Sequence, residues 1–178
     1  MDEPQATILS VCISHKKGIP KTPKAVVKLI EGYGIEDDAH ASYSSHRQVS
    51  LLAYESIIKM QRLGLNVRPG SFGENITTRG IELTQLHIGD RLKIGDDVII
   101  EISQIGKVCH TRCAIYYKAG DCVMPREGVF ARVIAGGLIQ PGDAITMYSL
   151  VEQNKEQSLS EVGFMQTKTT LSERKDNL

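Results

Sequence analysis

The sequence predicts a mainly β fold with a few helices, that is, an α+β domain built on a sheet or barrel. Two observations predict it. Short runs rich in β-branched residues recur along the chain, and glycine–aspartate pairs that favour tight turns stand between several of them. Short strands separated by such turns are typical of β-sheets and barrels, whereas βαβ units alternate their strands with long helical segments.

The expected strands follow the β-branched runs. In order along the chain they cover residues 6–13, 25–30, 75–78, 98–102 and 144–147. The expected turns are Gly89-Asp90, Gly95-Asp96, Gly120-Asp121 and Gly142-Asp143. Glycine adopts positive φ angles without a steric penalty, which is why turns favour it.

Two segments have a helical pattern instead. Residues 51–63 place apolar side chains near one helical face, with Ser50 as the expected N-cap and Gly64 just beyond the last turn. Residues 125–135 carry valines at helical spacing, begin with Pro125 in the first turn and are followed by a pair of glycines. We therefore expect a helix in each segment.

The length of 178 residues fits one domain. Hydrophobic residues make up 41% and charged residues 24%, as in an ordinary globular protein, so a packed core is expected. From about residue 152 onward polar residues dominate and apolar residues are isolated. This predicts a domain over residues 1–150 and a polar tail over 151–178, whose few apolar residues could dock on the domain or on a second subunit.

The balance of charge excludes some classes of partner. The 21 lysines and arginines equal the 21 aspartates and glutamates, so no overall field attracts nucleic acid or an anionic membrane. No apolar run approaches the roughly 20 residues that a membrane span requires, and the acidic N-terminus does not resemble a signal peptide. We expect a cytoplasmic protein with neither nucleic acid nor membrane as a partner.

The four cysteines are expected to be free, catalytic or metal-bound in such a compartment. Cys12 lies in an apolar run and is expected to be a buried small hydrophobic residue. Cys109, Cys113 and Cys122 fall within 14 residues. Basic neighbours stabilise a thiolate and make it reactive; here they are Lys107, His110 and Arg112.

Two other interpretations of these cysteines stay open. Cys109, Cys113 and Cys122 with a histidine could form a Cys₃His zinc site, although the spacing lacks a second close pair. The same residues could also be half-buried cysteines at the end of a strand, with solvated charges around them.

Two further segments are candidates for ligand binding. His40, in the motif Asp38-Ala39-His40, is followed by His46 and Arg47, and these basic groups suit an anion. In residues 69–76 the glycines allow a close backbone approach, while Glu74 and Asn75 could hydrogen-bond the edge of a heterocycle. Each segment could equally be an ordinary polar loop. The chain contains no P-loop and no dinucleotide-binding glycine motif.

Three segments stand out when they are taken in order: residues 34–40 (GIEDDAH), 46–52 (HRQVSLL) and 70–76 (GSFGENI). Together they resemble the MOSC domain, the molybdenum cofactor sulfurase C-terminal domain family. The resemblance continues through residues 86–90, Glu101, the segment 109–113 and residues 141–143, and it covers about residues 5–148. It is strongest with the small standalone bacterial members, which carry no aminotransferase-like domain.

The resemblance implies a MOSC-type, barrel-like β fold that handles the molybdenum cofactor, a phosphorylated pterin dithiolene bearing molybdenum or tungsten. It also implies a reactive cysteine that carries sulfur or binds the metal. Arg112-Cys113 matches the arginine–cysteine pair of the amidoxime-reducing branch, so Cys113 is the expected catalytic residue and metal ligand, with Cys109 as the second candidate. The cofactor-binding residues expected on this basis are His40, His46, Arg47, Phe72, Glu74, Asn75, Arg112 and Arg126.

The function implied first is that of a cofactor-binding or sulfur-carrier protein in cofactor sulfuration, maturation or delivery. Its partners would be molybdenum or tungsten enzymes, cofactor biosynthesis proteins and a cysteine desulfurase, and an oligomer stays open. The second function is a small molybdenum-dependent reductase of N-hydroxylated bases or amidoximes that borrows its electron donor. The third is a zinc-stabilised, non-catalytic β domain. Whether the protein is an enzyme stays open at this stage.

Overall fold

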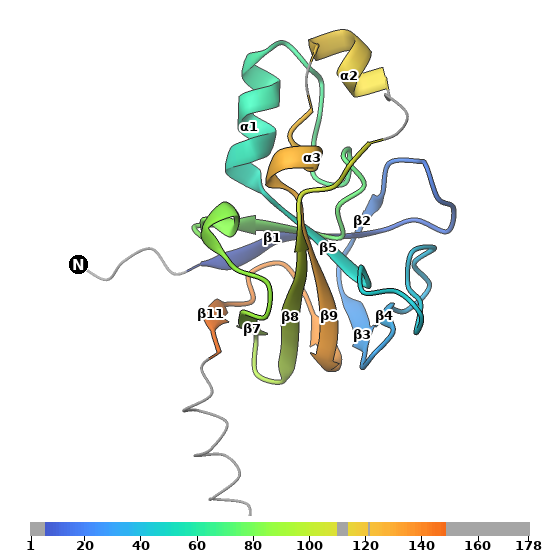
Figure 1. The fold of residues 1–178 in the computed structure, drawn as a ribbon, viewed down its shortest axis with the longest axis vertical. Coiled ribbons are helices and arrows are strands. Elements are labelled where there is room, and N and C mark those ends of the chain that lie inside the picture. Colours follow the sequence, from blue (N-terminus) through green and yellow to red (C-terminus); the bar gives the residue numbers. More distant parts are fainter. Residues whose placement is uncertain (1–5, 110–113, 121, 149–178) are drawn as a thin grey trace, which may run out of the picture. The chain divides into compact units, whose positions relative to one another are not determined.

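The computed structural model describes residues 6–109, 114–120 and 122–148 (Figure 1). The chain divides into two units, Met1–Met147 and Tyr148–Leu178, and the following description concerns the first. The predicted tail over residues 151–178 lies outside the described residues and stays a prediction.

Eleven strands in the described part of the chain form two sheets. The larger sheet has the order β11-β7-β8-β9-β5-β6-β1-β2, and all its paired strands are antiparallel except β5 and β6. Its strands are β1 (Thr7–Ile13), β2 (Thr22–Lys24), β5 (Val49–Ala53), β6 (Ile76–Arg79), β7 (Arg91–Ile94), β8 (Val98–Ile105), β9 (Val129–Ala135) and β11 (Ile145–Met147). The smaller sheet has the order β10-β3-β4, from β3 (Val27–Ile30), β4 (Gly34–Ile35) and β10 (Gly137–Ile139).

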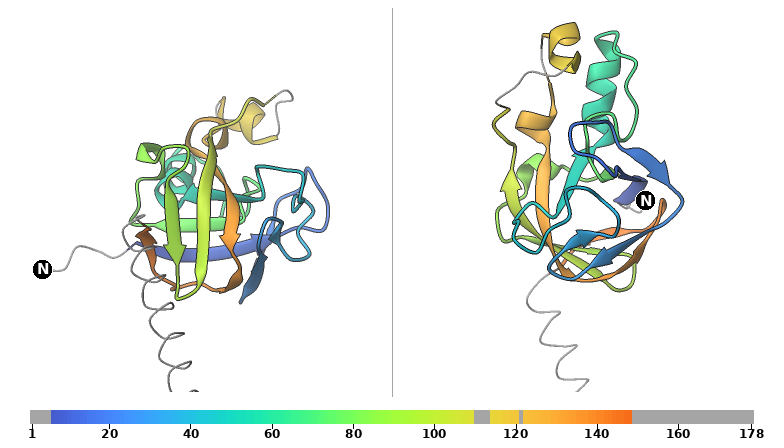
Figure 2. Two further views of the ribbon diagram at one scale, coloured as in Figure 1. Left: turned by 60° about the horizontal axis from the view of Figure 1, so that its bottom comes forward. Right: turned by 90° about the vertical axis from the view of Figure 1, so that its right-hand side faces the viewer.

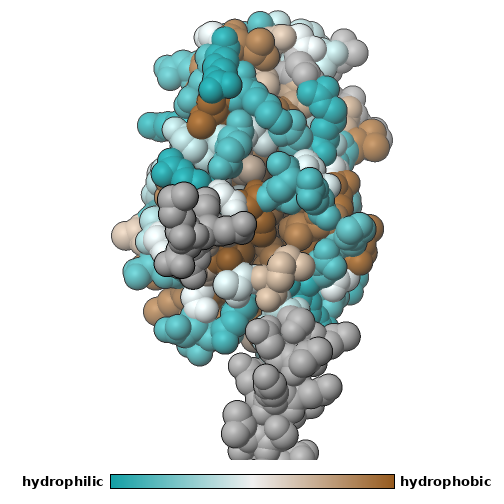
Figure 3. Space-filling view, turned by 90° about the vertical axis from the view of Figure 1, so that its left-hand side faces the viewer, coloured by the Kyte–Doolittle hydropathy of each residue, from teal (hydrophilic) through white to brown (hydrophobic). Residues whose placement is uncertain are grey.

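The three α-helices of the described residues gather at one end of the larger sheet, at the top of Figure 1 and of the right-hand view in Figure 2. They are α1 (Tyr54–Arg62), α2 (Ala114–Ala119) and α3 (Met124–Glu127), and a 3₁₀ turn, η1 (Leu83–Gln85), follows β6. Figure 3 shows the side on which α1 stands, where hydrophilic side chains cover much of the surface and apolar surface is visible at mid-height. None of the described helices is long and apolar enough to cross a membrane.

The mainly β fold with a few helices is confirmed, but the sheets are not closed into a barrel as the family resemblance implied. Closure would need a continuous ladder between β1 and β11. Within the described residues, only one isolated bridge, Thr7 with Ala144, and a few backbone hydrogen bonds join these regions, including Ile8 N–H to the Asp143 carbonyl at 2.9 Å. The strand β11 is only three residues long, too short for an extended ladder with β1.

The core formed by the described residues consists of two hydrophobic clusters that share β5. The larger cluster lies among the strands and the smaller one beneath the helices, and neighbouring residues of β5, Leu51 and Leu52, belong to one cluster each. The smaller cluster contains Leu52, Ile57, Met60, Leu65, Val67, Phe72, Val123, Met124 and Phe130. Because successive side chains of a strand point to opposite faces, β5 is buried on both faces.

The five predicted strand segments are confirmed, since each contains a strand. Both predicted helices are only partly right. Residues 51–53 belong to β5, Ser50 is inside this strand, and α1 begins at Tyr54 after an N-cap at Ala53. The predicted end of α1 is confirmed, since Gly64 has a φ of +85° just after it.

The segment 125–135 contains only the short helix α3, and most of it is the strand β9. Its valines lie in a strand that pairs with β5 on one side and β8 on the other. Pairing on both sides satisfies the backbone in an extended form, and this tertiary context outweighs a helical spacing of apolar residues.

Candidate functional site

Ser50 in β5 lies where two of the predicted site segments meet. Its backbone N–H and hydroxyl both donate to Asn75 Oδ1, at 3.1 and 3.0 Å, and its carbonyl accepts the Asn75 N–H at 2.9 Å. On the other side Ser50 is in register with Phe130 of β9. The guanidinium of Arg47 lies over the Phe130 ring, 5.7 Å from its centroid. The segments 46–47 and 70–75, far apart in the sequence, therefore flank the start of β5.

The loop before β6 is held in shape by the buried carboxylate of Glu74. One oxygen accepts the Gly70 N–H at 2.6 Å and the Thr77 hydroxyl at 3.1 Å, and the other accepts the Phe72 N–H at 3.1 Å. Burial raises the pKa of this carboxyl, against the opposing effect of the hydrogen bonds it accepts. Gly70 has a φ of +89°, and a Cβ there would clash with the Lys21 carbonyl oxygen.

Asn75 and Phe72 also have their contacts inside the protein. The Asn75 amide is buried, accepts from Ser50 and donates from Nδ2 to the Cys12 carbonyl at 3.1 Å, so it ties β5 to β1. Phe72 packs in the smaller hydrophobic cluster, which also contains Phe130. The structure thus brings Phe72, Glu74 and Asn75 together as the frame of the loop.

The motif Asp38-Ala39-His40 is joined to a lysine that the sequence analysis did not single out. Lys21 Nζ lies 2.6 Å from Asp38 Oδ2 and 3.1 Å from His40 Nδ1, and the side chains of Lys21 and Asp38 are only 1% and 0% exposed. Burial alone would raise the pKa of Asp38, but the hydrogen bonds that its carboxylate accepts from the Lys21 ammonium and from the backbone N–H groups of Ser14 and His40 outweigh burial and hold this pKa well below its usual range. The His40 side chain is 42% exposed.

His46 and Arg47 lie over the end of β8. His46 Nε2 is 2.9 Å from Gln104 Oε1, and the His46 carbonyl accepts a hydrogen bond from the Ser103 hydroxyl. Both residues are exposed. Across residues 6–109, 114–120 and 122–148, no carboxylate lies within ion-pair distance of the Arg47 guanidinium. Its N–H donors therefore suit an external anion.

Cys109 follows the end of β8, close to the helix that carries Arg126. The Gly106 N–H donates to the Gly128 carbonyl at 2.6 Å and the Lys107 N–H to the Pro125 carbonyl at 3.0 Å, which ties this segment to α3. The Cys109 thiol is free and exposed, and Arg126 is exposed on α3. The predicted residues Arg112 and Cys113, and the flanking His110, lie outside the described residues.

The other two described cysteines differ from Cys109. Cys12 is completely buried, as predicted, and burial raises the pKa of its thiol. Cys122 is partly buried against the smaller hydrophobic cluster. No group of three metal-ligating side chains occurs in the part of the chain that the structure describes, and the zinc alternative also includes Cys113, outside that part.

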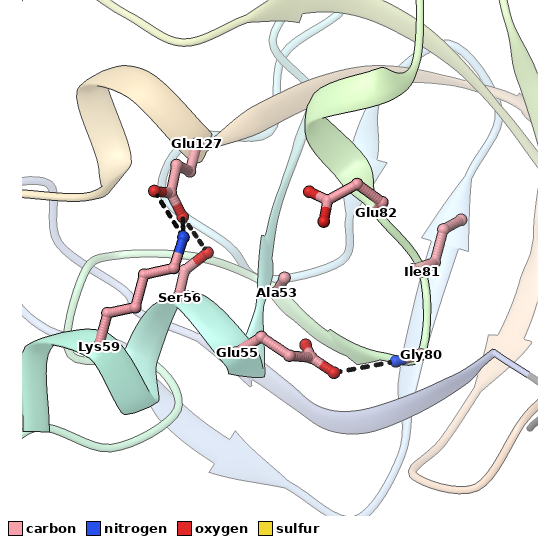
Figure 4. Close-up of a pocket in the computed structure, with 8 residues that line it drawn as sticks. All are labelled: Ala53, Glu55, Ser56, Lys59, Gly80, Ile81, Glu82 and Glu127. Carbon is pink, nitrogen blue, oxygen red and sulfur yellow. Dashed lines mark hydrogen bonds and ion pairs between the residues drawn. The ribbon is translucent and has the colours of Figure 1, made fainter. Parts of the chain in front are cut away.

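A pocket of about 300 Å³ lies at the start of α1, and none of the predicted site residues lines it (Figure 4). On one side Lys59 Nζ is 3.0 and 3.2 Å from the two Glu127 oxygens, and the Ser56 hydroxyl donates to the same carboxylate. On the other side Glu55 accepts the Gly80 N–H at 3.2 Å. Glu82, which also lines the pocket, accepts a hydrogen bond from the Thr84 hydroxyl at 2.6 Å, so each of these polar side chains has a partner within the protein.

Fold and site together define a mainly β domain with exposed basic side chains near the start of β5 and a free thiol beyond β8. The family model of the MOSC domain matches residues 38–146, more than half of the chain. The chain belongs to the MOSC domain family, which is associated with molybdenum cofactor binding or sulfuration.

Solved structures share this fold. YuaD from Bacillus subtilis is similar at 17% identity with a TM-score of 0.67, over 82% of this chain and 98% of that one. YiiM from Geobacillus stearothermophilus is similar at 22% identity and a TM-score of 0.60, over 81% and 75% of the two chains. YiiM from Escherichia coli is similar at 21% identity and a TM-score of 0.58, over 82% and 71%. No curated protein sequence matches the chain significantly.

The sequence analysis missed three residues of this region. Ser50 was assigned to a helix cap, and neither Lys21 nor Gln104 was singled out. A lysine between prolines carries no signal of burial, since lysine is almost always exposed unless it is paired. The residues that pair with Lys21, Asp38 and His40, are 17 and 19 positions away along the chain.

Proposed function

We propose that the protein is a cytoplasmic carrier that binds the molybdenum or tungsten pterin cofactor and acts in its sulfuration, maturation or delivery through a reactive cysteine. The observation that supports this proposal is the convergence of segments 46–47 and 70–75 on the start of β5, with the Cys109 segment and Arg126 tied together beyond β8. Free cysteines suit the reducing environment of the cytoplasm.

The exposed groups fit an anionic cofactor. Arg47 presents N–H donors at the surface beside the exposed His46, and Arg126 is exposed near the thiol segment. A guanidinium can bind two oxygens of a phosphate at once, which makes arginine a strong partner for such a group. We assign the phosphate to Arg47 and His46, with Arg126 and Arg112 near the cysteines. Phe72, Glu74 and Asn75 act by holding the loop in place.

The working cysteine is Cys113 or Cys109. Sulfur transfer and binding of a soft metal both need a thiolate, and basic neighbours stabilise one. Cys12 is unsuited, because it is buried and burial raises the pKa of its thiol. When bound, the cofactor supplies a metal that accepts a sulfur ligand. A cysteine desulfurase would supply the sulfur, and a second cysteine four residues away would help to pass it on.

Metal analysis of protein purified natively from cells grown with molybdate or tungstate tests the proposal. We expect molybdenum or tungsten together with pterin fluorescence, lost in Cys113→Ser and retained in the control Cys12→Ala. Loss in Cys109→Ser alone would move the working residue to Cys109. Loading that survives both serine variants would exclude a thiolate role, and zinc without pterin would support the zinc-stabilised alternative.

The same preparation distinguishes the carrier from the reductase. A loaded protein that reduces N-hydroxyadenine when an electron donor is added would be an enzyme. A loaded protein that passes its cofactor or sulfur to a recipient enzyme, and does not reduce this substrate, would be a carrier.

A further inference from the structure

The buried ammonium of Lys21 has three acceptors around it. Nζ lies 2.6 Å from Asp38 Oδ2, 3.1 Å from His40 Nδ1 and 3.5 Å from Ser14 Oγ. The Ser14 hydroxyl donates its own hydrogen to the Lys16 carbonyl at 3.0 Å, so its oxygen is available to accept. An ammonium has three N–H donors and no acceptor, and here each donor has one partner.

This arrangement determines which of the two ring nitrogens of His40 carries the hydrogen. Because the ammonium can only donate, the nitrogen that faces it, Nδ1, must be the acceptor and cannot carry a hydrogen. A neutral imidazole with an unprotonated Nδ1 carries its hydrogen on Nε2. The facing carboxylate, Asp38 Oδ1, is 3.6 Å from Nδ1 and accepts the backbone N–H of His40 at 3.1 Å instead.

The outer nitrogen of His40 is directed away from the ion pair. Since Nδ1 faces the buried ammonium, Nε2 lies on the opposite edge of the ring, and the side chain is 42% exposed. Among the residues that the structure describes, Nε2 of His40 has no hydrogen-bond partner. His46 differs, since its Nε2 is already 2.9 Å from Gln104 Oε1.

We propose that Lys21 is a positioning residue that keeps His40 as an Nε2–H donor for an oxyanion of the bound ligand. Asp38 balances the lysine charge, and the lysine keeps Nδ1 from taking up the hydrogen. His40 then offers a hydrogen bond, and not a proton-accepting nitrogen, to the ligand. The assignment of this oxyanion to the cofactor rests on the proposed function, whereas the state of the ring does not.

Nitrogen-15 NMR of the imidazole side chains in the full chain tests this inference. In the native protein we expect a single neutral form of His40 with the hydrogen on Nε2 and an unprotonated Nδ1. Addition of inorganic phosphate should shift the Nε2–H resonance of His40 more than that of His87, whose side chain is 85% exposed and pairs with Asp90.

Two variants isolate the contribution of Lys21. Lys21→Met leaves the buried Asp38 carboxylate without its counter-charge and is expected to unfold readily, so the informative variant is Lys21→Met with Asp38→Asn, which removes both charges. We expect this double variant to lose the single form of His40 and to show both neutral forms. Ser14→Ala removes only the longest of the three contacts and should leave His40 unchanged.

Each result bears on a different step. A native His40 with its hydrogen on Nδ1 would overturn the inference, and so would a double variant that folds and still shows only the Nε2–H form. A phosphate shift at His40 no larger than at His87 would overturn the oxyanion assignment. Failure to purify a molybdenum or tungsten cofactor would contradict the proposed function and leave the ring measurement intact.

Discussion

The Asp38 carboxylate, fully buried beside Lys21, links the stability of the fold to pH. Its pKa is lower in the folded protein than in the unfolded chain, so it stabilises the fold above the unfolded value of about 4. That stabilisation is lost as the pH falls below about 4 towards the folded value. Asp38→Asn should therefore lower the free energy of unfolding by roughly 3–5 kcal/mol at pH 7, and by progressively less below pH ~4.

Urea unfolding of the native protein and the variant from pH 7 to pH 3 measures this difference. Glu36→Gln is a matched control, because Glu36 pairs with Lys28 at 3.6 Å and both side chains are about half exposed. Exposed pairs contribute less than about 1 kcal/mol, so the control should behave like the native protein. A difference between Asp38→Asn and the native protein that does not change with pH would contradict the assignment.

Arg47 lies at the surface and should matter for binding more than for folding. Arg47→Ala should weaken cofactor binding by about 1.5–3 kcal/mol, the range for a charge-assisted hydrogen bond. Loss of the contact with the Phe130 ring should reduce the stability of the unloaded protein by no more than about 1 kcal/mol. Isothermal titration and thermal melts measure the two quantities, with the exposed Arg62 of α1 as control in Arg62→Ala. An equal loss of stability and binding would make Arg47 a structural residue.

The cysteines should differ in reactivity because their surroundings differ. Alkylation by iodoacetamide at mildly acidic pH should label Cys113 or Cys109 first and Cys12 last, since Cys109 is exposed and Cys12 is buried with a raised pKa. Peptide mass spectrometry gives the order in which the cysteines are alkylated. In the unfolded protein all cysteines are accessible, so we expect this order to disappear. Labelling of Cys12 as fast as Cys109 in the native protein would mean that the end of β1 opens readily.

At the scale of secondary structure, the β-branched runs predicted the strands because those segments pack against a core. Residues 49–53 misled the prediction, because this strand is buried on both faces and has no alternation of polar and apolar residues. A continuous apolar run fits a buried strand and one side of a helix equally well. The pairing of β5 with β6 and β9 decides between them, and this pairing is not visible in the local sequence.

The candidate site, like the strands, could be predicted only in part from the sequence. The segments with His40, His46, Arg47 and Glu74 were found from their polar residues and glycines and from their order. That Glu74 holds the loop from inside follows from backbone N–H groups that converge on its carboxylate, and no sequence pattern reports this. The burial and pairing of Lys21 could not be predicted from the sequence for the same reason, since its partners Asp38 and His40 lie in a loop distant along the chain.

The loop before β6 gives a test at this scale. Gly70 and Gly73 both have positive φ angles, but a Cβ on Gly70 would clash with the Lys21 carbonyl, whereas a Cβ on Gly73 would meet nothing within 4 Å. Gly73→Ala should cost about 1–2 kcal/mol of unfolding free energy through backbone strain alone. Gly70→Ala should cost clearly more, because its Cβ would also clash with the Lys21 carbonyl, and the hydrogen bond from the Lys21 N–H to the Gly70 carbonyl at 2.8 Å holds the two backbones close together. Urea unfolding of both variants measures this, and equal losses would contradict the clash.

At the scale of the whole molecule, the two hydrophobic clusters fix the position of the site. The larger cluster holds the strands together and the smaller one joins Phe72 of the loop to Phe130 of β9, beneath Arg47. The site segments thus rest on two packed cores that consist of the protein's own apolar side chains. We therefore expect the protein without cofactor to fold, with its basic groups already near their binding positions.

The domain should fold without residues 152–178. The last strand of the larger sheet, β11, ends at Met147, and its Ile145 is buried in the larger cluster opposite Ile94 of β7. The segment removed is polar with isolated apolar residues, which cannot form a core. A chain ending at residue 151 should therefore melt cooperatively, with a free energy of unfolding within about 0.5 kcal/mol of the full chain. A chain ending at Gly142 loses β11 and its contact with β7, and should be strongly destabilised. If the chain that ends at residue 151 does not melt cooperatively, the tail is an integral part of the fold or is exchanged with a second copy.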